Sequence, residues 1–454
     1  MNSHIVKIES LAPSGHGIAE NGWYILGAFP EDTVRAKRYK EAEEIIYAEL
    51  IEIIEPSPNR TYSPTKSPFF DPNAPWQYLD IDAEDRFKKN IIRNIFKKYN
   101  ININSEIASQ TRNDNSLLTE GYRNKAAYAF TYDSDNKLSF ALFTRGISQP
   151  GKISQSENIL VHPVINKIGK QFLEFFNQKK VPLETLKYLT LRYSYYTNTV
   201  VAQILVTESS RKKLPWKKSD LKTFIHQHSE IQGIIVSQSE PQVRSANIIK
   251  DFYTLGDIEI TEEILGKKYT YHPSQFFQIY PDAFAQILTD CENLITSIPN
   301  HHQYELLDFF AGIGIIGLHI SDLVQSIHGV EQSALASKYA LINAQQNNIE
   351  ISDQAGDASD FQFTEANVDE ALEYIKSDQI LIVDPARSGL TKKSLEKIVQ
   401  VQPEYIIYIS CNPETQARDY KVLHDVYDIK WSRAYNLFPK TPHIEHVLFL
   451  KRKN

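Results

Sequence analysis

From residue 265 to the end of the chain, short apolar runs alternate with segments that have the character of helices. Each run is bounded by polar residues or a turn and predicts a buried strand, and the runs cover residues 304–307, 327–330, 379–383 and 405–409. Alternation of strands and helices is typical of a doubly wound parallel sheet with helices on both faces. We therefore predict an α/β domain of this type over residues 263–454.

Residues 1–58 follow another pattern, in which short apolar runs are separated by glycine turns. The runs predict the strands of a small β-barrel and cover residues 5–8, 23–26, 33–36 and 45–54. The turns are expected at residues 15–17 and 21–22. Small barrels of the oligonucleotide-binding type often bind nucleic acid. This segment carries more acidic than basic residues, so its fold is the only argument for contact with RNA.

Residues 59–119 contain a linker and one helix. The prolines between residues 56 and 75 predict a stiff linker that follows the protein surface. Apolar residues at helical spacing predict an amphipathic helix over residues 83–99, and its many cations are expected to form a solvated face.

Residues 120–262 predict a central α/β unit. Its expected strands cover residues 126–132, 137–143, 189–196, 200–206 and 233–238, and its expected helices cover residues 163–179 and 218–228. Between residues 167 and 222 there are twelve Lys or Arg residues against four Asp or Glu, with tyrosines and Trp216 interleaved. Such a segment suits the binding of unpaired bases, although solvated lysines over an ordinary core explain it equally well.

Composition narrows the class of protein. The chain has 454 residues, more than one core normally holds, and a formal net charge of -7, which argues weakly against a nucleic-acid partner. Its two cysteines, Cys291 and Cys411, cannot build a disulfide framework or a cysteine metal site. The start of the chain lacks a signal-peptide core, and no apolar run would cross a bilayer, so we expect a cytoplasmic protein without a membrane partner.

A glycine-rich loop follows the first predicted strand of the last domain. Gly312, Gly314 and Gly317 have the spacing of the dinucleotide fingerprint, and Glu331 lies about twenty residues further on, where an acid binds ribose hydroxyls. An adenosine-containing ligand is therefore expected. The loop does not distinguish NAD from other ligands of this kind, and glycines needed only for packing are the alternative.

Asp308, Glu331, Asp384 and Cys411 each follow an apolar strand. In a parallel sheet, this places them along one edge and around one crevice. Cys411 is then a candidate nucleophile beside an adenosine site, whereas hydride transfer to NAD would need no such cysteine. The alternative for Cys411 is a small buried side chain without reactivity.

The last predicted strand, residues 447–450, supplies a candidate partner for Cys411. Glu445 enters this strand and can reach the same edge of the sheet, although a surface carboxylate is the simpler interpretation of its spacing alone. His443 and His446 have the character of metal ligands, but no third ligand accompanies them, so we predict no metal site.

Taken in order, a set of motifs in the last domain resembles those of the RNA 5-methyluridine methyltransferases, class I enzymes that use S-adenosylmethionine. The motifs are Gln275-Phe-Phe-Gln278, Asp308-Phe-Phe-Ala-Gly312-Ile-Gly314, Gly329-Val-Glu331, Asn343-Ala344, Gly356-Asp357-Ala358, Asp384-Pro-Ala-Arg387, Ser410-Cys-Asn-Pro413 and Phe438-Pro-Lys-Thr-Pro-His-Ile-Glu445. The resemblance covers residues 265–454. The stretch from Tyr122 to Ala126 is similar to the start of the family's central domain, and the amino-terminal barrel is similar to its TRAM module.

The resemblance implies roles for individual residues. Cys411 matches the family nucleophile, which adds to C6 of uracil, and Glu445 matches the base that removes the C5 proton. The positions that match cofactor contacts are Gln278, Phe310, Gly312, Gly314, Glu331, Asp357 and Asp384. The expected product is 5-methyluridine in structured RNA, made by a monomer. We favour 23S ribosomal RNA as the target because a barrel accompanies the catalytic domain, and the T-loop uridine of transfer RNA is the alternative.

Several positions depart from the family pattern. Many members bind an iron–sulfur cluster through cysteines just after the barrel, but residues 67–77 contain no cysteine, so no such cluster is expected and packing on Trp76 is a candidate substitute. Tyr280, Ala386 and Asn436 also differ from common family residues. Two other functions stay open at this point: an NAD-dependent oxidoreductase, and an RNA-binding protein without catalytic activity.

Overall fold

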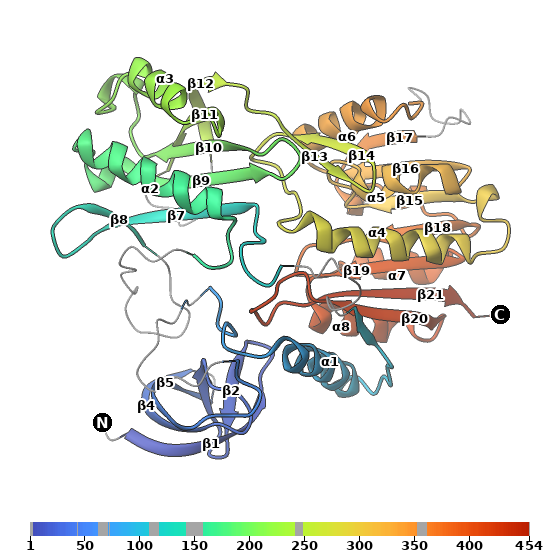
Figure 1. Cartoon of the computed structure of the whole chain (residues 1–454). Helices are drawn as coiled ribbons and strands as arrows, with labels where there is room; N and C mark the ends of the chain where they lie inside the picture. Colours follow the sequence, from blue (N-terminus) through green and yellow to red (C-terminus); the bar gives the residue numbers. More distant parts are fainter. Residues whose placement is uncertain are drawn as a thin grey trace. The chain divides into compact units, whose positions relative to one another are not determined.

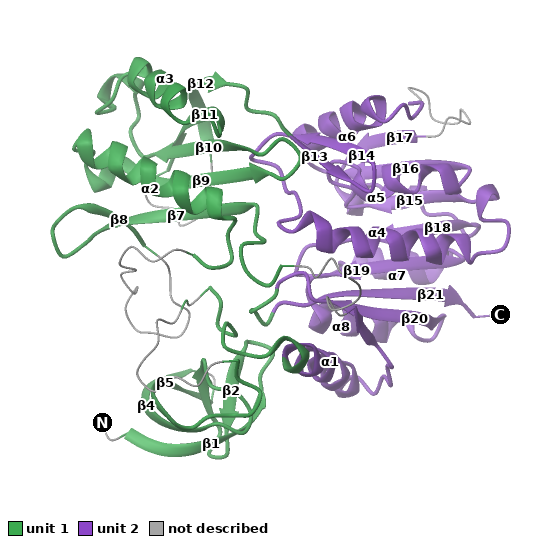
Figure 2. Ribbon diagram, viewed as in Figure 1, with its two compact units in different colours: residues 1–83, 118–260, 439–442 green, residues 84–117, 261–438, 443–454 purple. Residues whose placement is uncertain are grey.

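The computed structural model describes residues 3–42, 44–61, 71, 73–108, 118–141, 158–240, 248–351 and 361–453. The chain forms two compact units, each assembled from segments that are distant in sequence (Figure 2). Unit 1 comprises residues 1–83, 118–260 and 439–442, and unit 2 comprises residues 84–117, 261–438 and 443–454. The division into four consecutive domains, which follows from the sequence pattern, stays a prediction.

Unit 1 begins with a closed barrel of strand order β1-β2-β3-β5-β4. The strands are β1 (Ser3–Leu11), β2 (His16–Ala19), β3 (Trp23–Leu26), β4 (Thr33–Ala42) and β5 (Ile45–Glu55). The turn predicted at residues 15–17 is shorter than expected. Gly15 has the left-handed φ of +87° that a turn favours, but His16 already starts β2. Gly17 lies within that strand, and the position requires glycine because a Cβ there would lie 2.5 Å from the carbonyl oxygen of Ala28.

The linker after the barrel is described only in part, since residues 62–70 and 72 lie outside the described residues. Its first residues are fastened to the barrel by a buried ion pair of 2.6 Å between Arg60 and Asp32. Further on, Trp76 is completely buried and its indole nitrogen donates to the carbonyl oxygen of Gly15 at 3.0 Å. These contacts support the expectation that packing on Trp76 orders this part of the chain.

The rest of unit 1 is a six-stranded sheet of order β12-β11-β10-β9-β7-β8 (Figure 1). Its elements are β7 (Lys125–Tyr132), β8 (Leu138–Ala141), α2 (Pro163–Gln178), η1 (Leu183–Thr185), β9 (Leu186–Ser194), β10 (Thr199–Val206), η2 (Arg211–Lys213), α3 (Lys218–Gln227), β11 (Ile231–Ser239) and β12 (Ile248–Gly256). All the strands and helices predicted for this region are present. The sequence did not predict the edge strand β12, because its first four residues are exposed and show no alternation.

Unit 2 is built on an eight-stranded sheet of order β17-β16-β15-β18-β19-β21-β20-β6. The strands are β6 (Glu106–Ala108), β15 (Glu305–Phe309), β16 (Ser326–Glu331), β17 (Phe361–Glu365), β18 (Gln379–Val383), β19 (Tyr405–Ser410), β20 (Tyr427–Tyr435) and β21 (Glu445–Arg452). The five strands from β17 to β19 are parallel, four of them as predicted and β17 not predicted, but β21 is inserted antiparallel between β19 and β20. The sheet is therefore mixed rather than wholly parallel.

Helices cover both faces of this sheet. In the view of Figure 1, α4 crosses in front of the strands while α7 and α8 lie behind them. The remaining elements of unit 2, of which α1 and β13 begin in the last residues of a unit 1 segment, are α1 (Ile81–Lys98), β13 (Ile260–Ile264), β14 (Lys267–Tyr271), α4 (Pro281–Thr296), η3 (His301–Gln303), α5 (Ile315–His319), η4 (Ser321–Leu323), α6 (Ala334–Gln346), η5 (Val368–Glu370), η6 (Leu372–Tyr374), α7 (Lys392–Val401) and α8 (Pro413–Leu423). Among the described helices, none has both the length and the apolar character needed to cross a membrane.

Candidate active site

The carboxyl ends of the parallel strands bring four predicted site residues to one edge of the sheet in unit 2. Asp308 lies near the end of β15, Glu331 ends β16, and Asp384 and Cys411 directly follow β18 and β19. The chain runs outward from β15 to β16 and β17 and then returns to the other side of β15 with β18. Such a reversal is where a doubly wound sheet opens its ligand-binding crevice.

The pairing of β19 with β21 brings Glu445 to the same edge. The two strands are antiparallel, and Ser410 is paired with His446 where the ladder ends. One step further along the same register, Cys411 lies opposite Glu445. Glu445 is 6% exposed and Cys411 is half-buried, so both belong to the wall of the site rather than to the open surface.

Charged groups act on the Cys411 thiol in opposite directions. Burial raises the pKa of the thiol to about 11, and the carboxylates of Glu445 and Asp384 contribute to the rise. The Arg387 guanidinium lowers the same pKa. In the free protein the thiol is therefore mostly protonated at neutral pH, and Arg387 is the nearby side chain that favours the reactive thiolate.

The two carboxyl groups near Cys411 are also perturbed. Burial raises the pKa of Glu445 well above its ordinary value, and the charge of Asp384 adds to this effect while Arg387 opposes it. Burial raises the pKa of Asp384 to about 7. Carboxyl groups with raised pKa values are stronger bases once ionised, which suits them to removing a proton from carbon.

The glycine loop after β15 is held by Glu331. One carboxylate oxygen of Glu331 accepts from the backbone nitrogen of Gly312 at 3.1 Å, and the other accepts from that of Ser333 at 2.8 Å. Gly312 and Gly314 have φ angles of +56° and +83°, which favour glycine. A Cβ on Gly312 would meet no atom within 4 Å, so the space in front of this loop is open.

Asp308 places a buried carboxyl group next to the end of the glycine loop. Its Oδ2 accepts from the backbone nitrogen of Gly317 at 3.2 Å, while Oδ1 has no hydrogen-bond partner among the described residues. Burial raises its pKa to about 7, and the charges of Asp384 and Glu331 reinforce the rise. The carboxyl groups of Asp308, Asp384 and Glu331 would attract a positively charged ligand, so an adenosine ligand with a positive charge suits this site.

Two more of the predicted cofactor residues, Phe310 and Gln278, lie in described parts of unit 2. Phe310 follows β15 with a left-handed φ of 64°, and it is half-buried. Gln278 is half-buried in the segment between β14 and α4, where the rings of Tyr271 and Phe277 stack at 4.3 Å. Asp357 lies outside the described residues. The described residues contain no cluster of side chains able to hold a metal ion.

Comparisons with known proteins identify the family. The family model tRNA (Uracil-5-)-methyltransferase matches residues 87–453. This chain belongs to that family. It is an RNA (uracil-5-)-methyltransferase, and its reaction is the S-adenosylmethionine-dependent methylation of uracil C5 in RNA. The interpretations as an NAD-dependent oxidoreductase and as a non-catalytic RNA-binding protein are therefore wrong.

Relatives match the enzyme along nearly its whole length. An uncharacterized RNA methyltransferase of Lactobacillus johnsonii is 28% identical, over 99% of this chain and 97% of its own. Another, NEQ053 of Nanoarchaeum equitans, is 28% identical, over 98% of this chain and 93% of its own. The solved structure of Pyrococcus abyssi tRNA (uracil-54, C5)-methyltransferase in complex with S-adenosyl-L-homocysteine has a TM-score of 0.76 at 21% identity, covering 98% of this chain and 100% of that one.

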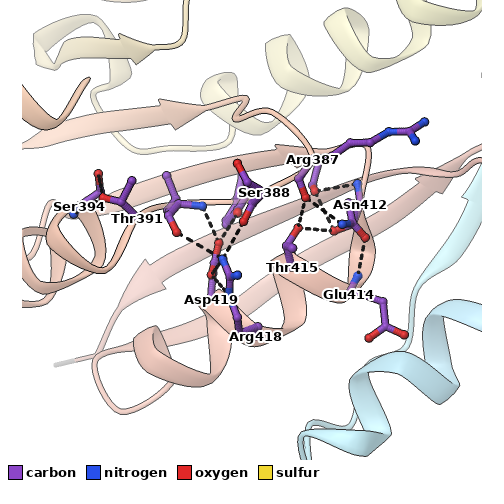
Figure 3. A network of polar contacts seen from close by, with 12 residues as sticks. Arg387, Ser388, Thr391, Ser394, Asn412, Glu414, Thr415, Arg418 and Asp419 are labelled. Atoms are coloured by element: carbon purple, nitrogen blue, oxygen red, sulfur yellow. Dashed lines mark hydrogen bonds and ion pairs between the residues drawn. The ribbon is translucent and has the colours of Figure 1, made fainter. Parts of the chain in front are cut away.

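In this methyltransferase, helix α8 joins the Cys411 loop to the loop that follows β18 (Figure 3). The side chains of Asn412 and Thr415 both donate to the carbonyl oxygen of Arg387, at 2.8 and 3.2 Å. The buried Asp419 accepts from the backbone nitrogen of Leu390 at 2.8 Å. The two loops that carry Arg387 and Cys411 are thus fixed to one helix.

A second buried network lies directly behind the two proposed reactive residues. Gln416 donates to the carbonyl oxygens of Tyr408 on β19 and His446 on β21, at 2.8 and 3.2 Å. Its own oxygen lies 2.6 Å from Nδ1 of His446, whose Nε2 lies 3.0 Å from the Ser105 hydroxyl. Burial lowers the pKa of His446 to about 3, so the ring is neutral, and it links α8 to the segment before β6.

Helix α1 supports the segment that leads to Glu445. Lys88 is completely buried and pairs with Glu84 at 2.8 Å and with the amide oxygen of Asn436 at 2.5 Å. The amide nitrogen of Asn436 donates to Glu84 and to Asp85. An acid at position 436 would bring a third negative charge and no donor to this cluster, which explains the departure from the family pattern. Sequence reasoning missed Lys88, because its contact with Asn436 joins residues that are far apart in the chain.

Proposed function

We propose that Cys411 is the nucleophile and Glu445 the base of this methyltransferase, acting on a uridine in structured RNA. The observation that carries the proposal is the strand register that sets Cys411 opposite Glu445, at the edge of the sheet that also holds the glycine loop. The effect of the Glu445 charge on the pKa of Cys411 is a second sign of their proximity.

The chemistry requires these two groups because C5 of uracil is a poor nucleophile. The Cys411 thiolate adds to C6, forming a carbon–sulfur bond while the electrons of the C5–C6 double bond move to O4 as an enolate. Arg387 favours this step by lowering the pKa of the thiol. When bound, S-adenosylmethionine supplies the methyl group that the activated C5 takes up.

The second half of the reaction restores the pyrimidine. C5 then carries both a hydrogen and a methyl group, and ionised Glu445 removes the hydrogen as a proton. The electron pair left at C5 rebuilds the C5–C6 double bond and expels the Cys411 thiolate. The raised pKa of Glu445 makes it a stronger base, at the cost of a smaller ionised fraction at neutral pH.

The residues proposed to hold S-adenosylmethionine are Gln278, Phe310, Gly312, Gly314, Glu331, Asp357 and Asp384. The open space before Gly312 and the unpaired Oδ1 of Asp308 support this assignment. A sulfonium beside Asp308 and Asp384 would also relieve the mutual repulsion of these carboxyl groups.

The proposal also concerns which class of RNA is methylated. The sequence pattern favoured ribosomal RNA because a barrel accompanies the catalytic domain. The Pyrococcus structure named for transfer RNA matches 98% of this chain, so a barrel is compatible with both targets. We retain 23S ribosomal RNA and the T-loop uridine of transfer RNA as the two candidates. The uridine must leave its stack to reach a thiol at the edge of the sheet.

The test is transfer of tritiated methyl groups to purified ribosomal and transfer RNA from a strain that lacks this protein. We expect transfer with the wild-type enzyme to one of the two RNA classes, no transfer with Cys411→Ala, and normal transfer with Cys291→Ala as the matched cysteine control. Because Cys291 is completely buried in α4, its small replacement also reports on tolerance to a core change. Wild-type rates in Cys411→Ala would contradict the proposed nucleophile.

A further inference from the structure

Unit 2 has a surface hollow that the reaction does not use. It measures about 760 Å³ and lies at the carboxyl end of α1 and along the segment that follows this helix. Its polar lining consists of Arg93, Asn94, Lys97, Asn100, Asn102 and Asn104. These side chains are exposed, so the hollow is open to a large ligand.

Basic residues dominate this part of the sequence. From residue 86 to residue 105 it holds six Lys or Arg residues and no Asp or Glu, although Lys88 is buried against Glu84 and Lys98 pairs with Glu414. Arg93 and Lys97 stand one turn apart on the same face of α1, and neither forms an ion pair with a described residue. The negative end of the helix dipole accounts for a cation in the last turn, such as Lys97, but not for Arg93 in the turn before it.

The asparagines form the other wall of the hollow. Ile101 and Ile103 are buried at 9% and 7% exposure, and the alternation of an extended segment directs Asn102 and Asn104 to the outside. The amide groups of these two asparagines make no hydrogen bond to any described residue. Each amide offers both donors and an acceptor, which is the combination that base edges and ribose hydroxyls require.

The hollow lies close to the catalytic edge of the same unit. Lys98, next to Lys97, pairs at 2.8 Å with Glu414, three residues after Cys411. In Figure 3 the side chain of Glu414 points toward the pale blue α1. On the inner side of α1, the ring of Phe96 lies 5.5 Å from the ring of His446, the neighbour of Glu445.

We propose that this hollow binds the RNA strand that flanks the target uridine. Arg93 and Lys97 take the phosphates of the strand, while Asn100, Asn102 and Asn104 contact its bases or riboses. The inference rests on the proposed function, because it assumes that the RNA enters the site beside Cys411. It adds to that function an anchoring surface on the catalytic unit itself, separate from the barrel and from the basic segment of unit 1.

The test is the double charge reversal Arg93→Glu with Lys97→Glu. Loss of two phosphate contacts should weaken binding of a labelled oligouridylate and of an unmodified transfer RNA transcript by about tenfold or more, and reduce the slope of log affinity against log salt by roughly 1.4. We expect KM for substrate RNA to rise by the same factor as the RNA affinity falls. The value of kcat at saturating RNA and the affinity for S-adenosylmethionine should not change. The triple change of Asn100, Asn102 and Asn104 to alanine should weaken binding without changing the salt slope.

The matched control is Lys338→Glu with Lys397→Glu, which changes the net charge equally on α6 and α7 of the same unit. An equal loss of RNA binding in this control would show that only net charge matters and would overturn the inference. Unchanged RNA affinity and salt slope in the Arg93→Glu, Lys97→Glu enzyme would overturn it as well. A wild-type chain that transfers no methyl group would instead refute the proposed function, and the binding measurement keeps the two failures apart.

Discussion

At the scale of single residues, the site concentrates carboxyl groups around the place where a sulfonium is expected to lie. Burial raises the pKa of Asp308 and of Asp384 to about 7, and the charges of Asp384 and Glu331 add to the rise at Asp308. Ionising these groups is costly in the free protein. A cation bound beside them would be stabilised by each carboxylate and would lower both pKa values.

Binding of S-adenosylmethionine should therefore depend on pH. We expect its affinity, measured by calorimetry, to increase from about pH 6 to about pH 8, as carboxyl groups with a pKa of about 7 lose their protons. S-adenosylhomocysteine has a neutral sulfur and serves as the control, with a smaller change over the same range. Equal pH dependence of the two ligands would contradict this electrostatic account.

The Asp308→Asn variant should change the unfolding temperature and the affinity for S-adenosylmethionine in opposite directions. The pKa of Asp308 in the folded protein lies above its ordinary value, so its ionisation removes stability as the pH rises from about 4 to about 7. The variant avoids that loss while its amide oxygen can still accept from the Gly317 nitrogen. We expect a higher unfolding temperature than wild type at about pH 8, no such gain at about pH 4, and weaker binding of S-adenosylmethionine.

The site residues that the sequence identified lie in short motifs, whereas those that it missed depend on partners in other parts of the chain. Cys411 and Glu445 lie in motifs that can be identified within a few residues of sequence. Gln416, His446 and Lys88 act through partners that only folding brings to them, such as the carbonyl oxygen of Tyr408 or the amide of Asn436. Lys88 in particular belongs to a helix whose cations were expected to be solvated, and it is completely buried.

At the scale of elements, α8 is the part that holds the site together. It follows Cys411 directly, begins with Pro413 after the capping residue Asn412, and binds both the loop after β18 and the strands β19 and β21. Small displacements of a reacting group lower rates strongly, so a helix with contacts to both sides keeps the thiol and the carboxyl group in register.

Gln416→Leu tests this role of α8. It removes one donor from each of two buried carbonyl oxygens and should lower stability by about 1–3 kcal/mol. We expect kcat to fall by roughly a hundredfold, because the thiol is displaced, while the KM values for RNA and S-adenosylmethionine change little. Gln400→Leu, on the exposed side of α7, is the matched control. Wild-type kcat in folded Gln416→Leu would show that the network has no positioning role.

The elements also show what a hydrophobic pattern can predict. Continuous apolar runs in the parallel part of the sheet were located within one or two residues, and β18 matches its predicted bounds, because both faces of such strands are buried. The strands β6, β12, β17 and β20 were among those missed, since their short length or their polar and exposed residues remove the pattern. The antiparallel insertion of β21 also could not be predicted, because the hydrophobic pattern of one sequence does not show which strands pair with each other.

At the scale of the whole molecule, the chain returns repeatedly to each of its two compact units. Residues 84–117 belong to unit 2 although they precede most of unit 1, and residues 439–442 belong to unit 1 although the catalytic strands on either side belong to unit 2. A reading of the sequence from end to end predicts consecutive domains and cannot predict such returns. The segment just before Glu445 therefore connects the catalytic unit with the unit that contains the barrel.

The central claim is that Cys411 forms a bond to the RNA that Glu445 must help to break. The direct test is to mix Glu445→Gln with substrate RNA and S-adenosylmethionine and to search for a complex that survives denaturation. We predict a covalent complex whose digest gives the peptide around Cys411 joined to a methylated uridine, and no complex when Cys411→Ala is added. Full turnover by Glu445→Gln without such a complex, or attachment of the RNA to another residue, would contradict the account.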